Sequence, residues 1–110
     1  MSEAHRLMRR HRTRHLPVLH RGKLVGIISA GDLQLLETLR NVDPEQVRVE
    51  EAMTAAPYCA APDTPVDQVV DVMAANKYGC AVVSSNGEVV GIFTTVDALA
   101  AFAELIRATR

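Results

Sequence analysis

The sequence is poor in aromatic residues and cysteines and has no long apolar run. It contains no tryptophan, and aromatic residues make up 4% of its 110 residues, whereas 48% are hydrophobic. Its core must therefore be aliphatic. Cys59 and Cys80 lack CxxC spacing, which excludes a disulfide framework and favours a reducing, cytoplasmic location. No apolar run approaches the ~20 residues of a membrane span, and the charged residues 1–14 do not resemble a secretory signal.

Charge is unevenly distributed along the chain, although the net charge is only −1. The first 23 residues hold seven Arg and Lys side chains against one acidic residue, Glu3, a net charge of +6, so the remainder carries −7. All four histidines lie in the same basic segment. This segment fits either a solvated helix face or a site for anions, such as phosphates or nucleic acid. Composition does not choose between the two.

The chain contains an internal repeat. A shift of 65 residues aligns positions 4–36 with positions 69–101 without a gap. Identical residues then fall at Met8/Met73, Val18/Val83, Gly22/Gly87, Val25/Val90, Gly26/Gly91, Ile27/Ile92 and Asp32/Asp97. Such self-similarity predicts a duplicated structural unit rather than two unrelated segments.

Each copy is predicted to run helix, strand, hairpin, strand, helix. In the second copy apolar residues recur at positions 66, 69, 70 and 73, the spacing of an amphipathic helix, with Asp63 or Thr64 as its expected cap. Strands are expected over residues 81–83 and 88–93 around Asn86-Gly87, a dipeptide suited to a tight hairpin. Arg21-Gly22 occupies the same place in the first copy. Closing helices are expected near residues 32–39 and 96–108.

The two copies are not equally complete. Residues 49–62 form an additional opening segment before the first helix of the second copy, and the matching part of the first copy would precede Met1. We therefore expect a first repeat over residues 1–43 that lacks its opening strand, and a second, complete repeat over residues 44–110. A partner chain is one candidate to complete the first repeat.

The same short motif occurs in both copies where a strand meets the closing helix. It reads GIISAGD at residues 26–32 and GIFTTVD at residues 91–97. One interpretation is a pair of capping boxes, Ser29 with Asp32 and Thr94 with Asp97. The other is a ligand site, because free N–H groups at a helix start attract phosphate and a carboxylate can accept ribose hydroxyls. Two copies in register strengthen the second interpretation.

With these motifs, the chain resembles tandem CBS-domain pairs, also called Bateman modules. The resemblance rests on residues 15–18 (HLPV), the hairpins, residues 24–29 (LVGIIS) with Asp32, and residues 89–94 (VVGIFT) with Asp97. It implies an α/β (α+β) fold of two βαββα repeats related by pseudo-twofold symmetry. It also implies a non-catalytic sensor that binds AMP, ADP, ATP or S-adenosylmethionine between its repeats and regulates another protein.

The resemblance further implies two nucleotide-binding clefts, each shared by both repeats. One would take Ser29 and Asp32 for phosphate or ribose and line the adenine with Thr54, Tyr58 and Cys80. The other would combine Thr94 and Asp97 with Arg14 and His15 near the phosphates. In both, the adenosyl compound is a regulatory ligand, and no cofactor is required.

Two other functions stay open, and two chemistries are not expected. The basic segment makes a nucleic-acid-binding module possible, and the capping interpretation makes the chain a ligand-free dimerisation scaffold. Catalysis is not expected, since the paired aspartates repeat one role instead of dividing acid and base roles. His11 and His15 have metal-ligand spacing on a helix, but residues 16–18 begin a strand, so no metal site is expected. We also expect a homodimer formed through helix faces.

Overall fold

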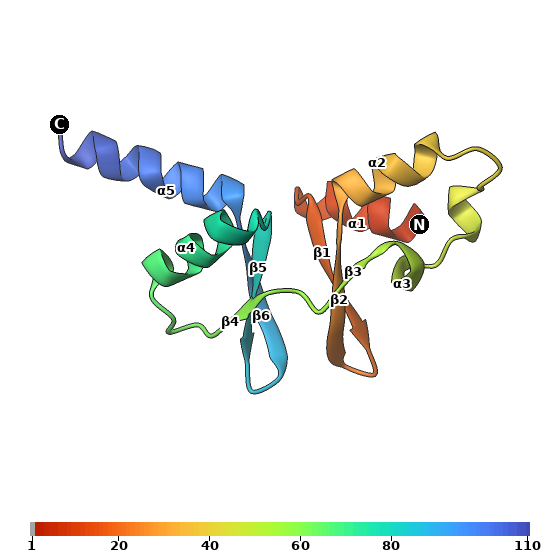
Figure 1. Ribbon diagram of the computed structural model, residues 1–110, viewed down its shortest axis with the longest axis horizontal. Coiled ribbons are helices and arrows are strands. Elements are labelled where there is room, and N and C mark those ends of the chain that lie inside the picture. Colours follow the sequence, from red (N-terminus) through yellow and green to blue (C-terminus); the bar gives the residue numbers. More distant parts are fainter. Residues whose placement is uncertain (1) are drawn as a thin grey trace. The chain divides into compact units, whose positions relative to one another are not determined.

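Two antiparallel hairpins, one in each repeat, form the centres of two small sheets (Figure 1). The computed structural model describes residues 2–110, without the side chain of Ser2. The first hairpin pairs β1 (His15–His20) with β2 (Lys23–Ser29), and the second pairs β5 (Cys80–Ser85) with β6 (Glu88–Thr94). The turn residues have φ of 52° and 78° at Arg21-Gly22, and 52° and 82° at Asn86-Gly87. Positive φ at both positions is the geometry of a tight two-residue hairpin, so both predicted turns are confirmed.

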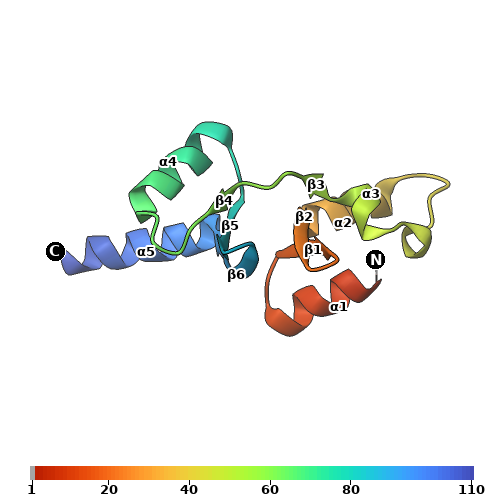
Figure 2. The ribbon, with the colours of Figure 1, turned by 90° about the horizontal axis from the view of Figure 1, so that it is seen from below.

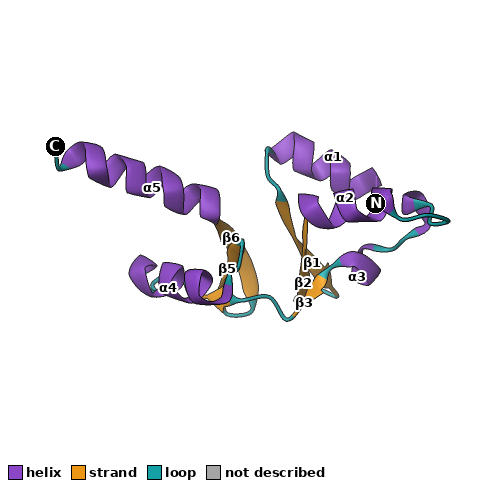
Figure 3. Cartoon of the chain, turned by 45° about the horizontal axis from the view of Figure 1, so that its top comes forward, coloured by secondary structure: helices purple, strands orange, loops and turns teal. Residues whose placement is uncertain are grey.

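Helices flank both hairpins, as the repeat predicts. They are α1 (Ser2–His11) and α2 (Ala30–Thr38) in the first copy, and α4 (Val66–Asn76) and α5 (Thr95–Ala108) in the second. In the first copy α1 and α2 contact each other, and they lie side by side in Figure 3. The cap predicted for α4 is wrong. Pro65 occupies the N-cap position, and its side chain has no atom that could accept a capping bond. The Thr64 hydroxyl accepts a hydrogen bond from the N–H of Ala61 (3.1 Å) instead of capping α4.

A short segment between the copies supplies a third strand to each sheet. It begins with the 3-10 turn η1 (Pro44–Gln46) and α3 (Val49–Ala52). Next, β3 (Thr54–Ala55) pairs antiparallel with β2, and β4 (Cys59–Ala60) pairs parallel with β5. The sheet orders are therefore β1-β2-β3 and β4-β5-β6. The second copy has the predicted order β4, α4, β5, β6, α5, and the described part of the first copy begins with α1 instead of a strand.

β3 and β4 lie on the same connecting segment but pair with different sheets, and this decides where the chain divides into compact units. Contacts split the chain into Met1–Pro57 and Tyr58–Arg110, because α3 and β3 pack on the first sheet while β4 belongs to the second. Figure 2 shows both strands on the one connecting segment. The predicted boundary between residues 43 and 44 separates the two sequence repeats, not the two compact units, and it stays a prediction.

Each unit has its own aliphatic core. The first consists of Ala4, Met8, Val18, Ile28 and Leu33, and the second of Val69, Met73 and Ala81, with Val82 also fully buried. Met8 and Met73 are equivalent residues of the repeat, and both are buried as expected of core positions. The cores hold the sheet against its helices and so position the strand–helix junctions.

Candidate functional site

The two repeated motifs form the same structure at the two strand–helix junctions. In the first unit the N–H of Ser29 donates to Oδ2 of Asp32 (2.8 Å), and the N–H of Asp32 donates to Oγ of Ser29 (3.1 Å). In the second unit Thr94 and Asp97 make the same two bonds, also at 2.8 and 3.1 Å. Both are complete capping boxes. The capping interpretation is therefore confirmed, and each carboxylate keeps Oδ1 without a hydrogen-bond partner among residues 2–110.

The first unit brings Arg14 and His15 to the junction that holds Ser29 and Asp32. His15 is the cross-strand partner of Ser29, and the carbonyl of Arg14 accepts a hydrogen bond from the N–H of Ala30 (2.8 Å). The sequence analysis assigned these residues to two different clefts. They are neighbours in one unit because β1 and β2 pair in antiparallel register, so the start of one strand meets the end of the other.

His15 lies in a partly desolvated place. Its Nδ1 is buried and has no hydrogen-bond partner in the described part of the chain. Burial lowers the pKa of His15, the nearby Arg14 charge lowers it further, and the charge of Asp32 opposes both effects. The neutral imidazole is therefore favoured at this junction. The charges of Arg14 and Asp32 thus act in opposite directions on the pKa of His15.

The second unit repeats this arrangement with different chemistry. Cys80 is the cross-strand partner of Thr94, and the carbonyl of Gly79 accepts from the N–H of Thr95 (3.1 Å). Gly79 and Cys80 thus stand where Arg14 and His15 stand in the first unit. Burial raises the pKa of the Cys80 thiol, which keeps it protonated and unreactive. The second junction consequently has no basic side chain at these two positions.

The remaining predicted site residues lie on the connecting segment. Thr54, in β3, is exposed and pairs with Ile27 in the first sheet. Tyr58 belongs to the second unit, where its carbonyl accepts from the N–H of Val82 (2.9 Å) and its ring packs on the core. The structure places Thr54 with Ser29 and Asp32, and Tyr58 with Cys80, Thr94 and Asp97, each group in its own unit. The expected sharing of clefts across the repeats stays a prediction.

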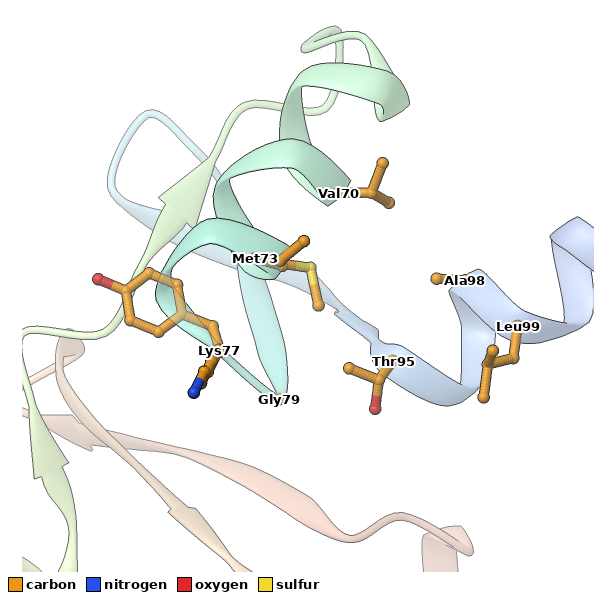
Figure 4. Close-up of a pocket in the computed structure, with 9 residues that line it drawn as sticks. Val70, Met73, Lys77, Gly79, Thr95, Ala98 and Leu99 are labelled. Atoms are coloured by element: carbon orange, nitrogen blue, oxygen red, sulfur yellow. The ribbon is translucent and has the colours of Figure 1, made fainter.

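Sequence reasoning missed one aromatic contact and one cavity. The rings of Tyr58 and Tyr78 stack with centroids 5.8 Å apart. Tyr78 also lines a cavity of about 460 Å³ between α4 and α5, with Lys77 and Gly79 at its edge and Val70, Met73, Thr95, Ala98 and Leu99 around it (Figure 4). The two tyrosines lie 20 residues apart with no shared motif, so the sequence gave no signal of their contact.

The described part of the chain contains neither a cluster of metal ligands nor a membrane-spanning helix. Residues 2–110 contain no group of three or more His, Cys, Asp or Glu side chains placed to hold a metal ion. His11 ends α1 and His15 begins β1, so the two do not share a helix face. None of the helices in this part of the chain combines the length and the apolar character that crossing a membrane requires.

Comparison with known proteins identifies the repeats. The model of the CBS domain matches residues 1–36 and 49–104. An inosine-5′-monophosphate dehydrogenase of Korarchaeum cryptofilum is 34% identical over 98 residues, which are 88% of this chain but only 19% of that enzyme. The chain therefore spans about a fifth of the length of this relative.

Solved structures show the same fold. The CBS domain pair of protein MJ0100, in complex with 5′-methylthioadenosine and S-adenosyl-L-methionine, has a TM-score of 0.81 and 31% identity and covers 94% of this chain, which covers 81% of it. A putative acetoin utilization protein (AcuB) from Vibrio cholerae has a TM-score of 0.78 and 26% identity, with 97% and 79% covered. The duplicated αββα pattern, the paired strand–helix junctions and these matches together show that the chain belongs to the CBS domain family, as a pair of CBS repeats.

Proposed function

We propose that this chain is a non-catalytic regulatory module of the cytoplasm that binds an adenosyl ligand, AMP, ADP, ATP or S-adenosylmethionine, between its two repeats. The observation that carries the proposal is the pair of equivalent junctions, each with a carboxylate whose Oδ1 lacks a hydrogen-bond partner in the described chain. A carboxylate in the first turn of a helix can accept ribose hydroxyls. The complex of the MJ0100 pair with two adenosyl compounds supports this ligand class.

Each proposed cleft takes its polar residues from one unit and its adenine-lining residues from the other. Ser29 and Asp32 would hold phosphate or ribose in the first cleft, with Thr54, Tyr58 and Cys80 along the base. Thr94 and Asp97 would do the same in the second, with Arg14 and His15 near the phosphates. A ligand that bridges the repeats regulates an attached or separate protein by linkage, since it shifts a conformational equilibrium only by its differential affinity for the two states.

We propose further that the module is a homodimer that associates through the apolar face of α5. Leu99, Phe102 and Ile106 follow one another at helical spacing, and their exposed fractions are 67%, 59% and 39%. Large exposed apolar side chains in one stripe are typical of protein interfaces. Light scattering at micromolar concentration should show a dimer, and replacement of Leu99 and Phe102 by Glu should give a monomer. A monomeric wild type contradicts this proposal.

Calorimetric titration with AMP, ATP, S-adenosylmethionine and 5′-methylthioadenosine tests the ligand proposal. The informative variant is Asp32→Asn with Asp97→Asn, because asparagine can still accept the capping bond but lacks the negative charge. Asp71→Asn with Glu88→Gln makes the same change of charge at exposed positions and is the matched control.

We expect binding by wild type and control, and a loss of at least about tenfold in the Asp32, Asp97 variant, the effect of one charge-assisted hydrogen bond or more. If no adenosyl compound binds the folded wild type, the motifs serve only as caps and the chain is a dimerisation scaffold. Binding to a DNA oligonucleotide that weakens steeply with salt would instead favour the basic segment as a nucleic-acid site.

A further inference from the structure

The two units contain equivalent cavities between their helices. In the first unit a cavity of about 240 Å³ lies between α1 and α2, and its wall includes the loop that precedes β1. In the second unit the cavity between α4 and α5 occupies the same place (Figure 4). Every residue that lines the first cavity has its counterpart 65 positions later among those that line the second. The cavity is thus a property of the repeat, and its chemistry can be compared within one chain.

The two cavities share an apolar floor but differ in their polar groups. Met8 and Leu33 form the floor of the first, and Met73 and Ala98 stand in the same positions in the second. Seven of the eight equivalent pairs differ, and in four of them a polar or charged side chain of the first cavity is replaced by an aliphatic residue or glycine: His5/Val70, Arg9/Ala74, Arg14/Gly79 and Gln34/Leu99. The first cavity therefore has two guanidinium groups, an imidazole and an amide that the second lacks, and none of its lining residues is acidic. The polar groups of the second cavity are instead those of Lys77, Tyr78 and Thr95.

The two arginines of this cavity have no carboxylate partner. Among residues 2–110, ion pairs join Arg6 to Glu3, Arg48 to Glu50 and His5 to Glu37, and none includes Arg9 or Arg14. The pair between Nε2 of His5 and Oε1 of Glu37 measures 3.0 Å and holds the imidazole at the cavity wall. Planar guanidinium groups bind phosphate oxygens in a bidentate manner. Two of them at one cavity therefore favour an anion with several oxygens.

Backbone hydrogen bonds fix the loop that carries Arg14 between α1 and β1. At the end of α1, Arg12 is in the left-handed region (φ 51°), and the N–H of Thr13 donates to the carbonyl of Met8 (3.0 Å). The carbonyl of Arg14 then accepts from the N–H of Ala30 at the start of α2 (2.8 Å). The loop is thus tied to both helices. A site ordered in advance loses less free energy when it binds its ligand.

We propose that the cavity between α1 and α2 binds a phosphate group, either as the free ion or as a small monoester whose apolar part rests on Met8 and Leu33. Its volume corresponds to roughly eight water molecules, enough for a phosphate group. The proposal goes beyond the adenosyl clefts. Arg14 is common to both, whereas His5, Arg9 and Gln34 belong to this cavity alone.

The test is a titration of the full chain, labelled with 15N, with inorganic phosphate and, separately, phenyl phosphate. Amide resonances of Arg9, Thr13, Arg14 and Gln34 should shift together at one affinity, and those of their counterparts in the second cavity should not move. Tighter binding of phenyl phosphate identifies a monoester as the ligand, and equal affinity identifies the free ion. Shifts spread evenly over the exposed Arg6, Arg10 and Arg21 would overturn the proposal, because a diffuse basic surface would explain them.

Substitutions that replace a residue of the first cavity by its counterpart in the second test which side chains bind phosphate. Arg9→Ala reproduces residue 74 and should weaken phosphate binding roughly 10–100-fold, as the loss of a charge-assisted bond does. Arg10→Ala removes the same charge from the same helix, but Arg10 does not line the cavity. It should change the affinity less than about twofold, since a charge that does not contact the ligand acts on it only through solvent. Equal effects of the two variants would overturn the proposal. The reverse graft, Ala74→Arg with Gly79→Arg, should create phosphate binding in the second unit.

Two further titrations distinguish this cavity from the adenosyl clefts and from a nucleic-acid surface. 5′-Methylthioadenosine has no phosphate, so its titration reports the adenosyl clefts alone, and Arg9→Ala should leave it unchanged. Phosphate binding without binding of 5′-methylthioadenosine supports this site. If S-adenosylmethionine also fails to bind and the binding of AMP and ATP is lost in Arg9→Ala, the adenosyl proposal is contradicted. A DNA oligonucleotide that binds more tightly with length and shifts Arg6, Arg10 and Arg12 as strongly as Arg9 overturns the cavity in favour of a nucleic-acid surface.

Discussion

Met53 lies directly over Gly26, so closely that a side chain at position 26 has no room. A Cβ built on Gly26 would contact Sδ of Met53, and it would lie 2.9 Å from both Cγ of Met53 and the carbonyl oxygen of Thr54. Gly26 pairs with Ala55, so this glycine is the point at which the connecting segment reaches the first sheet. At its counterpart Gly91, no atom of the described residues other than Gly91 and its two chain neighbours lies within 4 Å of the same position.

Gly26→Ala should therefore destabilise the chain, and Gly91→Ala should not. The added methyl group of Gly26→Ala forces Met53 and the β3 backbone to move, at a cost of about 1–3 kcal/mol, the usual range for overpacking. Chemical denaturation of both variants measures the difference. Equal stability of the two would show that β3 can shift away from β2 without loss.

The capping boxes give a second prediction. Ser29→Ala and Thr94→Ala should each lower the free energy of unfolding by ~1 kcal/mol, because each removes the acceptor for the N–H of Asp32 or Asp97. Ser29→Asn and Thr94→Asn keep an N-cap acceptor and should lose much less. Urea denaturation distinguishes the pairs, and an asparagine variant as unstable as its alanine counterpart would contradict the capping role.

Pro17 and Val82 are equivalent positions of the repeat, and they differ in whether the backbone nitrogen can donate a hydrogen bond. Val82 donates its N–H to the carbonyl of Tyr58 (2.9 Å), in a strand with neighbours on both sides. Pro17 has no N–H, and β1 has one neighbouring strand among residues 2–110. Val82→Pro should cost about 1–3 kcal/mol or more, because it breaks a buried bond. Pro17→Val should change the stability little. Thermal unfolding compares the two, and a tolerated Val82→Pro would contradict the pairing of β4 with β5.

His15 should make part of the stability depend on pH. Its pKa is lowered in the folded chain, mainly by burial, so the unfolded chain takes up a proton at a higher pH than the folded chain. This contribution is fully present above the ordinary histidine pKa of about 6.5. It is lost as the pH falls through the lowered folded value, because protons then favour the unfolded state.

The corresponding variant is His15→Phe, which keeps an aromatic ring but cannot bind a proton. Its free energy of unfolding should fall less between pH 7 and pH 5 than that of the wild type. His11→Phe, at an exposed position of α1, is the control and should keep the wild-type slope. Identical slopes for all three proteins would show that His15 is protonated as readily in the folded chain as in the unfolded one.

The sequence alone determined the local structure of each repeat. Periodic apolar residues, positive-φ turn dipeptides and the Ser/Thr–Asp motif act over a few residues, so their consequences follow from composition and spacing. The two helices of each repeat, both hairpins and both capping boxes were predictable for this reason, and so was the family, whereas η1 and α3 were not predicted. The cap of α4 was not predictable. The Thr64 hydroxyl could accept a hydrogen bond either from the start of α4 or from the preceding turn, and in the structure it accepts from the N–H of Ala61.

Only the tertiary structure decided which residues of different elements meet. The register of β1 on β2 placed His15 beside Ser29 and Asp32. Because β3 pairs with the first sheet, the first compact unit extends to Pro57. The sequence did not reveal this pairing, since a strand of two residues has too weak a local signal to identify its partner strand. The cationic cavity between α1 and α2 also depends on packing. Arg9 and Arg14 lie on different elements, and Gln34 lies 20 residues beyond Arg14, so only the packing of α1, α2 and the loop before β1 brings the three to one cavity.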